Sequence, residues 1–328
     1  SDTESSAMRT ILRGHEVLLS PAVSPDGRRI VYSTGYADYH LIEYSAAGKP
    51  LRSLAQTSRL EIGPSWSPAG DRFLYFTDAH GPMELWTRAA DGSRAAPLAS
   101  GLGYLTLQAR FSPDGARIAY LSGRNVWILP AAGGRAVPIV STPEGLRAGA
   151  LDWSRDGVWI FFETYDGTRF RLQKIASGGG QASVTLHEFI GGHSSVSVSP
   201  DGRWIAYFAV DGIHVIAPDG SNDRLLAQRP AVDGNFIPGS RNVYEYAGRG
   251  DDNRWRLIQI AVPEGQVLKT VDVDLDPSYS MLDFTVHPDG TRLIICAGDL
   301  KYDLWMLEGA PQPARGLRRI WSHWVDWQ

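Results

Sequence analysis

The sequence predicts an all-β fold, namely a β-propeller built from four-stranded antiparallel blades. One ten-residue phrase, "FSPDGARIAY" at 111–120, recurs along the 328-residue chain. Its relatives lie at 23–32, 66–75, 153–162, 198–207 and 286–295, with a degraded copy at 237–246. Successive copies are 38 to 50 residues apart, and each is followed by further strand-like segments. Seven copies predict seven blades, with six and eight as alternatives.

The phrase itself predicts a strand, a tight turn and a second strand. Ser-Pro-Asp-Gly suits a type I turn, in which proline fixes φ and glycine takes the left-handed position that closes the hairpin. The residues after the turn, such as Arg117 to Tyr120, are short and apolar, as in a buried strand. Each copy therefore supplies the first two strands of a blade.

Two more strands complete each unit. The third-strand segments, separated by a glycine turn from a fourth strand, lie at 40–44, 83–88, 125–130, 170–175, 212–217, 255–260 and 302–307. The chain offers one more candidate for the fourth strand of a blade than the seven units need, since such segments lie both at 8–13, before the first unit, and at 316–321, after the last. We expect one of these two segments to close the ring by completing a blade made from the other end of the chain. The tail 322–328 resembles the start of another unit, which keeps an eighth, partial blade open. We expect residues 1–7 to be disordered and 8–328 to form a single propeller domain.

Composition narrows the function classes. A formal net charge of −4, with no cluster of lysine and arginine, gives no electrostatic footprint for nucleic acid. The sequence has no long apolar run, so we expect no membrane insertion, and we expect a monomer. The single cysteine, Cys296, lies in the apolar segment "RLIICAG" and is interpreted as a buried, inert thiol.

The recurring (W/F/V)-S-P-D-G-x-x-(I/L)-x-(Y/F) unit resembles the repeat of TolB-like propellers from about Val23 onward. Such units occur in the periplasmic TolB protein, in sensor-like domains of bacterial kinases and winged-helix regulators, and in prolyl oligopeptidase-like enzymes. The resemblance implies a bacterial recognition or sensor domain, and it favours an extracytoplasmic, periplasmic location, with a cytoplasmic one as the alternative. TolB itself has six such blades and a separate N-terminal α/β domain, for which we find no segment before Val23.

Blade topology predicts which face binds. The first-to-second and third-to-fourth turns lie on one face of the disc and are uniformly short, whereas the loops of the opposite face vary between blades. Variable loops on a rigid scaffold are where binding is usually located. We therefore predict ligand binding at this irregular-loop face and at the mouth of its channel. The candidate ligand-binding residues are Tyr36, Asp38, His40, Asp78, His80, Tyr165, Asp166, His193, Arg249, Asp251, Asp252 and Asp299.

No catalytic residue is assigned. "GGHSSV" at 191–196 lacks the final glycine of a G-x-S-x-G nucleophile elbow. His187-Glu188 lacks the second histidine of a zinc-binding H-E-x-x-H motif, so no cofactor is predicted. A divalent metal in the channel, held by His40, His80 or His193, stays an open alternative.

Two functions remain. The first is a non-enzymatic recognition module that binds a protein segment, or a small ligand, at the irregular-loop face. The second is an enzyme, a lyase or hydrolase acting on carbohydrate or peptide, with a metal or carboxylate site at the channel mouth. An enzyme should bring two carboxylates, or a cluster of histidine and aspartate, within hydrogen-bond reach at that mouth, whereas a binding module need not.

Overall fold

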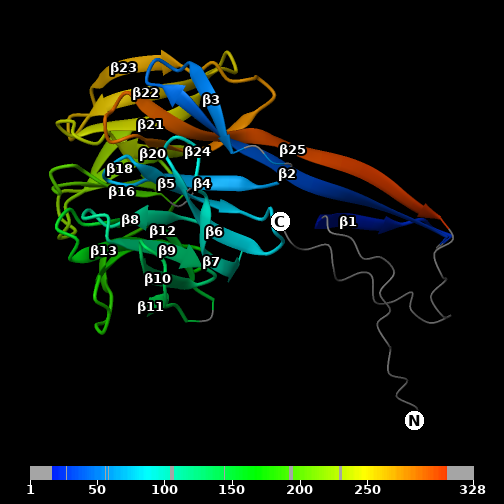
Figure 1. Ribbon diagram of the computed structural model, residues 1–328, viewed down its shortest axis with the longest axis horizontal. Coiled ribbons are helices and arrows are strands. Elements are labelled where there is room, and N and C mark those ends of the chain that lie inside the picture. Colours follow the sequence, from blue (N-terminus) through cyan, green and yellow to red (C-terminus); the bar gives the residue numbers. More distant parts are fainter. Residues whose placement is uncertain are drawn as a thin grey trace, which may run out of the picture. The chain divides into compact units, whose positions relative to one another are not determined.

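A computed structural model of the chain describes residues 17–308 except 27, 56, 58, 104–106, 144, 192–194, 229 and 230. The described residues form 25 strands, β1 to β25, and no helix long and apolar enough to cross a membrane (Figure 1). The all-β prediction is confirmed. The segments predicted to close the ring, 8–13 and 316–321, lie outside the described residues, as do 1–7 and the tail 322–328.

Five sheets have four antiparallel strands each, arranged in chain order. They are β4 (Glu61–Trp66), β5 (Arg72–Thr77), β6 (Met83–Ala89) and β7 (Ala96–Leu102); β8 (Ala109–Phe111), β9 (Arg117–Ser122), β10 (Asn125–Pro130) and β11 (Val137–Ser141); β12 (Arg147–Trp153), β13 (Trp159–Tyr165), β14 (Phe170–Ala176) and β15 (Val184–Phe189); β16 (Val196–Val198), β17 (Ile205–Ala209), β18 (Gly212–Ile216) and β19 (Arg224–Ala227); and β20 (Asp233–Phe236), β21 (Val243–Arg249), β22 (Trp255–Ala261) and β23 (Val267–Asp272). Each of these blades begins with one copy of the repeated phrase.

The sixth sheet joins the two ends of the described chain. Its path runs β1 (Val17–Val23), β2 (Arg29–Ser45), β25 (Arg292–Glu308), β24 (Ser280–Val286), and β3 (Pro50–Ala55) pairs with β2. The first and last copies of the phrase therefore contribute to one sheet. Seven repeats yield six sheets in the described residues, which matches the six-blade alternative.

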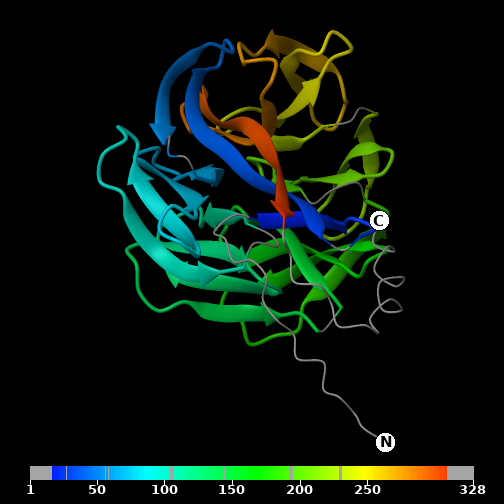
Figure 2. The ribbon, with the colours of Figure 1, turned by 90° about the vertical axis from the view of Figure 1, so that its right-hand side faces the viewer.

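The first strands of the six sheets contact one another in a closed ring, β4 to β8, β12, β16, β20, β24 and back to β4. Figure 2 shows the sheets following one another around this ring in sequence order. The four-stranded antiparallel propeller is thus confirmed, and its first strands line the central channel.

The chain divides into two compact units, 38–299 and a second one made of 1–37 with 300–328. The larger unit holds the closed ring. In the smaller one, β1 pairs with the first part of β2, and the indole Nε1 of Trp305 donates a hydrogen bond to Thr34 Oγ1 at 3.0 Å. Strands β2 and β25 contribute residues to both units.

Apolar layers between consecutive blades form the core of the larger unit. One layer packs Leu74, Phe76 and Leu85 of one sheet against Ile118 and Tyr120 of the next. Equivalent clusters lie between the following pairs of sheets up to β24 and β25. This packing explains why the strands of the repeat are apolar on both faces.

The repeated turn adopts the predicted conformation. Gly115 closes the turn with φ of 69°, and its amide donates a hydrogen bond to the Ser112 carbonyl at 2.8 Å. The Ser112 hydroxyl donates to Asp114 Oδ1 and accepts from the Arg117 amide. Because this network needs serine, aspartate and glycine together, the same phrase recurs in blade after blade.

Two expected loops are absent in the described chain. Residues 33–40 lie within β2 and 297–303 within β25, where we predicted irregular second-to-third loops. The first segment holds the strand-forming residues Thr34, Tyr36 and Tyr39 and no proline, so it can continue a ladder. The two long strands neighbour each other in the sixth sheet, which satisfies their backbone groups without a turn.

Candidate functional site

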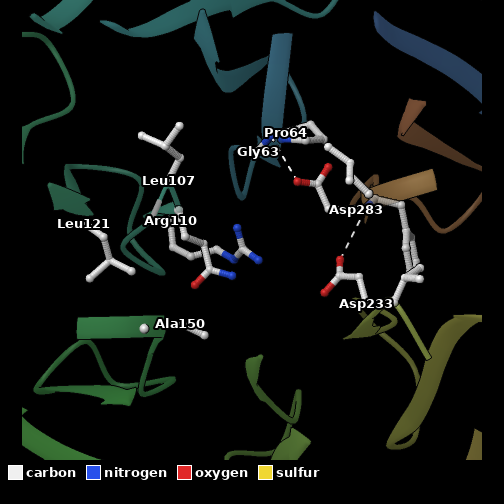
Figure 3. A pocket seen from close by; sticks show the side chains of 13 residues that line it. Gly63, Pro64, Leu107, Arg110, Leu121, Ala150, Asp233 and Asp283 are labelled. Atoms are coloured by element: carbon white, nitrogen blue, oxygen red, sulfur yellow. Dashed lines mark hydrogen bonds between the residues drawn. The ribbon is translucent and has the colours of Figure 1, made fainter. Parts of the chain in front are cut away.

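A cavity of about 180 Å³ lies at the channel mouth on the irregular-loop face. It is surrounded by the starts of the first strands, where the chain enters each blade from a fourth-to-next loop. Its lining residues are Gly63, Pro64, Leu107, Gln108, Arg110, Leu121, Gly149, Ala150, Val232, Asp233, Leu282, Asp283 and Phe284 (Figure 3). The lining combines apolar side chains with polar groups, and three charged side chains reach into the centre.

Asp233 is the first residue of β20, and its side chain points into the cavity (Figure 3). The residue is 9% exposed. Its Oδ2 accepts hydrogen bonds from the Phe284 amide and from the Asn235 side-chain amide, both at 3.2 Å. Burial raises the pKa of Asp233 to about 6, although the positive charge of Arg110 opposes that rise.

Asp283 occupies the equivalent position on β24, beside an irregularity in the ladder between Met281 and Asp283. Its Oδ2 accepts a hydrogen bond from the Gly63 amide of β4 at 3.1 Å, whereas its buried Oδ1 has no hydrogen-bond partner. Burial, and then the negative charge of Asp233, raise the pKa of Asp283 to about 7. The cavity therefore holds two carboxyl groups that resist ionisation.

Arg110 lies on the opposite wall, on β8, and its side chain extends toward the two acids (Figure 3). Its Nη1 donates a hydrogen bond to the Ala109 carbonyl at 3.1 Å. The guanidinium lowers the pKa of both aspartates, but less than burial raises it. No ion pair within 4.0 Å joins Arg110 to either acid in the described part of the chain.

Behind Asp283, the wall contains a buried thiol. Cys296 is fully buried on β25, and its Sγ donates a hydrogen bond to the Glu61 carbonyl at 3.4 Å. Burial raises the pKa of this thiol well above its usual range, with the charge of Asp283 adding to the effect. The interpretation of Cys296 as a buried thiol is confirmed.

A second cavity, of about 280 Å³, opens among the tight turns on the opposite face, where Pro68, Pro113 and Pro288 of the repeat line it. Two of its charged side chains bond to neighbouring backbone groups, although the Trp66 indole Nε1 has no hydrogen-bond partner. Asp152 Oδ2 accepts from the Val198 amide at 2.8 Å, and Arg155 donates to the carbonyls of Val198 and Ser199 at 2.7 and 2.9 Å. Because the Asp152 and Arg155 side chains already bond to backbone groups, whereas Asp283 Oδ1 has no partner, the first cavity is the better candidate site.

Comparison with known proteins identifies the family. The family model for the TolB beta propeller domain matches residues 1–237, which is more than half of the chain. The chain belongs to the TolB β-propeller family.

Relatives in this family match only part of the chain. The Tol-Pal system protein TolB of Anaeromyxobacter dehalogenans is 31% identical over 102 residues, which cover 30% of this chain and 23% of the relative. The protein TolB homolog of Chlorobium luteolum is 29% identical over 121 residues, covering 36% and 27%. The chain thus spans about a quarter of the length of these relatives.

Solved structures share the fold. A putative TolB from Agrobacterium tumefaciens superposes with a TM-score of 0.59 at 19% identity, over 81% of this chain and 99% of that one. An oligogalacturonate lyase in complex with manganese gives 0.52 at 14% identity, over 84% and 76%. Both likenesses show the propeller fold alone.

None of the described ligand-binding candidates of this TolB-type propeller is among the residues that line the cavity. His40 is buried on β2 with its Nε2 3.3 Å from Asp38 Oδ1, and Asp299 is on β25. Asp78 Oδ1 accepts from the Leu60 amide, and His80 lies 3.3 Å from Glu84 Oε2. The Tyr36 side chain and His193 lie outside the described residues.

The remaining candidates make local contacts in loops. Tyr165 donates a hydrogen bond to the Gly167 carbonyl, and Asp166 pairs with Arg171 at 2.9 Å. Arg249 donates to the Asn253 and Pro277 carbonyls. Asp252 pairs with Arg256, and Asp251 is exposed in the same turn. These contacts order the irregular loops, and their role in binding stays a prediction.

Metal ligation and nucleophilic chemistry have little further support. The described residues contain no group of three histidine, cysteine, aspartate or glutamate side chains placed to hold a metal ion. Of the predicted metal ligands, His40 and His80 each neighbour one carboxylate. The centre of the "GGHSSV" segment, 192–194, lies outside the described residues.

The sequence analysis missed Asp233, Asp283 and Arg110, although a signal for them exists. Side chains alternate across a strand, so the residues two and four places before the serine of the repeated turn face the channel. The first set is polar throughout; it comprises Ser65, Arg110, Asp152, Ser197, Asn235 and Thr285. The second set comprises Gly63, Gln108, Ala150, Ser195, Asp233 and Asp283. Charged residues at these channel positions mark the site.

Proposed function

We propose that this chain is a non-enzymatic recognition module, extracytoplasmic in location, that binds a protein segment at the channel mouth on the irregular-loop face. The observation that supports it best is the cavity at that mouth, with the carboxyl groups of Asp233 and Asp283 on one wall and Arg110 on the other. Ligand sites are typically concave and carry a few polar groups that fix the orientation of the ligand, and this cavity offers three charged side chains for that role.

Family membership supports a protein as the partner. The curated relatives are described as Tol-Pal system proteins, a name that places them in an assembly with other components. Only the propeller part is shared, so the partner of this chain does not follow from the name. The binding face is inferred from the cavity and the loops around it.

Peptide selection followed by footprinting tests this proposal. Peptides are selected from a random display library on the 328-residue chain, and amide hydrogen exchange then locates each bound peptide. We expect protection at the cavity walls, in residues 61–64, 107–110, 147–151 and 280–284. Protection confined to the tight turns or outer strands, or failure to select any peptide, would reject the proposal.

A pair of tryptophan variants supplies the control. Leu282 is 40% exposed at the cavity wall, and Val137 is 53% exposed on the outer strand β11. Leu282→Trp narrows the cavity and should weaken the selected peptides at least tenfold, whereas Val137→Trp should leave their affinity unchanged. Equal effects of the two variants would place the binding surface elsewhere.

The second candidate function is an enzyme, and the same two aspartates favour it. Paired carboxyl groups with raised pKa values are suited to general acid and base catalysis. A screen of oligosaccharide and peptide substrates tests this alternative. Turnover by the wild-type chain that is lost in Asp283→Asn would replace the recognition proposal with an enzymatic one.

A further inference from the structure

The charges around the cavity leave one negative charge without a counter-ion. When Asp233 and Asp283 are both ionised, the single guanidinium of Arg110 balances only one of them. Arg110 is also on the far wall, and no 4.0 Å ion pair joins it to either acid among the described residues. One added positive charge beside the acids would neutralise the cavity.

Hydrogen-bonding capacity is also left over at the acids. Backbone amides of Gly63 and Phe284 hold one oxygen of each carboxylate. Asp283 Oδ1 is buried without a hydrogen-bond partner, and an unpaired buried oxygen is costly. A donor group that enters the cavity could supply the missing hydrogen bonds.

Among the described groups that act most strongly on the pKa values of the two aspartates, Arg110 is the only cation, while Arg88 acts on the neighbouring Glu61. Few groups shift the pKa values of Asp233 and Asp283, or those of the neighbouring Tyr244 and Cys296. The ones that face this region from the packed strands are Glu61 on β4, Arg110 on β8, Glu163 on β13, Tyr244 on β21 and Cys296 on β25. Arg110 is the only cation among these groups.

We propose that the cavity takes one monovalent organic cation, the ammonium of a lysine or the guanidinium of an arginine, and seats it between Asp233 and Asp283. The cation is carried by the bound protein segment, so this inference rests on the proposed function. Charge-assisted hydrogen bonds to two carboxylates would give both affinity and orientation. The apolar walls formed by Leu107, Leu121 and Ala150 suit the aliphatic part of such a side chain.

A divalent metal ion fits the cavity less well. The described residues place no third carboxylate, histidine or cysteine where it could hold a metal ion together with the pair, and the Arg110 guanidinium extends toward the same space. Calcium and magnesium ions prefer six or more oxygen ligands, and any divalent cation is repelled by a nearby positive charge. A singly charged donor group would balance the one excess negative charge of the cavity and would also donate a hydrogen bond to Asp283 Oδ1.

Proton release couples to this binding. The cation binds the ionised carboxylates, and the folded pKa values of Asp233 and Asp283 are about 6 and about 7. Affinity should therefore rise as the pH increases from 5 to 8 and should level off above that range. Bound cation in turn lowers both pKa values.

Methyl NMR with small cations tests the inference directly. The probes are Nα-acetyl-lysine methylamide and its arginine analogue at millimolar concentration, with the uncharged norleucine analogue and calcium chloride as comparisons. We expect the lysine or arginine probe to shift the methyl signals of Leu107 and Leu121, which line the cavity, more strongly at pH 8 than at pH 5.5. Equal shifts with norleucine would indicate an apolar pocket, and saturation by calcium at lower concentration would indicate a metal site; either result overturns the inference.

Variants separate the acids from general charge effects. Asp283→Asn and Asp233→Asn should each weaken the cationic probe at least tenfold, since each removes a charged hydrogen-bond acceptor. Asp219→Asn removes the same charge from a third-to-fourth turn on the opposite face and should have no effect. Unchanged binding of the cationic probe in both acid variants would refute the proposed cation site.

Arg110→Gln is a second test that does not depend on the acid variants folding. Because it removes the competing positive charge, it should strengthen binding of the cationic probe severalfold; weaker binding would contradict the inference. Failure of the cation-binding inference can be distinguished from failure of the proposed function. Selected peptides that protect the cavity but contain no lysine or arginine would retain recognition and reject the cation.

Discussion

The backbone amide of Phe284 donates a hydrogen bond to the carboxylate of Asp233 at 3.2 Å, which ties the first strand of one blade, β20, to the first strand of the next, β24. Asn235 strengthens the same junction by donating to the Phe284 carbonyl at 2.8 Å. One blade further on, Asp283 accepts from the Gly63 amide of β4. The acids at the channel mouth thus connect three consecutive blades, so the candidate site and the closure of the ring share residues.

Substitution of Asp283 by asparagine should make stability less dependent on pH. The carboxyl pKa is about 7 in the folded chain against 3.8 as its ordinary value. The folded state therefore binds the proton more tightly, and the stability that this proton provides is present below pH 4 and lost as the pH rises to 7. Asparagine stays neutral and can still accept from the Gly63 amide. The difference in melting temperature, Asp283→Asn minus wild type, should increase from pH 5 to pH 8.

A charge-matched variant provides the control for that profile. The pKa of Asp219 is lowered, first by its hydrogen bond with the Ser221 hydroxyl, so this group stays ionised throughout the range from pH 5 to 8. The difference between Asp219→Asn and wild type should be flat over the same range. A flat profile for Asp283→Asn as well would show that Asp283 ionises normally.

Substitution of Arg110 by glutamine should raise the pKa values of both cavity aspartates. The guanidinium now opposes part of the effect of burial on each carboxyl group. Carbon-13 NMR of labelled aspartate side chains can follow the two titrations, which should move to higher pH in Arg110→Gln. Movement to lower pH, or no movement, would show that Arg110 does not act on the acids.

The fold was predictable because the residues of the repeated phrase determine the structure of its turn locally. Ser112, Asp114 and Gly115 form a turn that depends only on neighbouring residues, so the sequence pattern reports it directly. The number of blades was less accessible, since it depends on how β2 and β25, far apart in sequence, share one sheet. Pairing between distant strands leaves no local signature.

The site was only partly predictable, for a related reason. Channel-mouth binding on the irregular-loop face was expected from topology, and the cavity lies there. The predicted binding residues were loop residues, whereas Asp233 and Asp283 belong to strands whose other residues are mostly buried. Their raised pKa values arise from packing of several blades around them, which no single segment encodes.

Removal of one turn hydroxyl should cost measurable stability. Ser112 is fully buried, and its hydroxyl both donates to Asp114 and accepts from the Arg117 amide. Ser112→Ala leaves that amide without this partner and should lower the free energy of unfolding by about 1–3 kcal/mol. Chemical denaturation measures the change. Ser221→Ala lies in an exposed turn, where the hydroxyl donates to Asp219 and accepts from the exposed Asn222 side chain, and it should change stability by less than about 1 kcal/mol.

Restoring the repeat consensus at Arg155 should destabilise the propeller. Arg155 occupies the position held by proline in the other turns, for example Pro113 and Pro200. Proline there would stiffen the unfolded chain and add about 0.4–1 kcal/mol. It would also remove the guanidinium, which donates to the carbonyls of Val198 and Ser199 in the next blade. Hydrogen bonds from a charged group contribute about 1.5–3 kcal/mol, so Arg155→Pro should lower the free energy of unfolding.

A consensus substitution that breaks no contact separates the two effects. Ala69 stands where the repeat usually has aspartate, and in this turn the Ser67 hydroxyl donates to Asp71 instead, at 2.7 Å. Ala69→Asp should therefore change stability by no more than about 0.5 kcal/mol, the range of ordinary surface substitutions. Chemical denaturation of Arg155→Pro and Ala69→Asp measures the two changes in the free energy of unfolding. Stabilisation by Arg155→Pro would mean that the bonds of Arg155 to the next blade contribute less than the rigidity of proline, and that this turn departs from the repeat for a reason unrelated to blade packing.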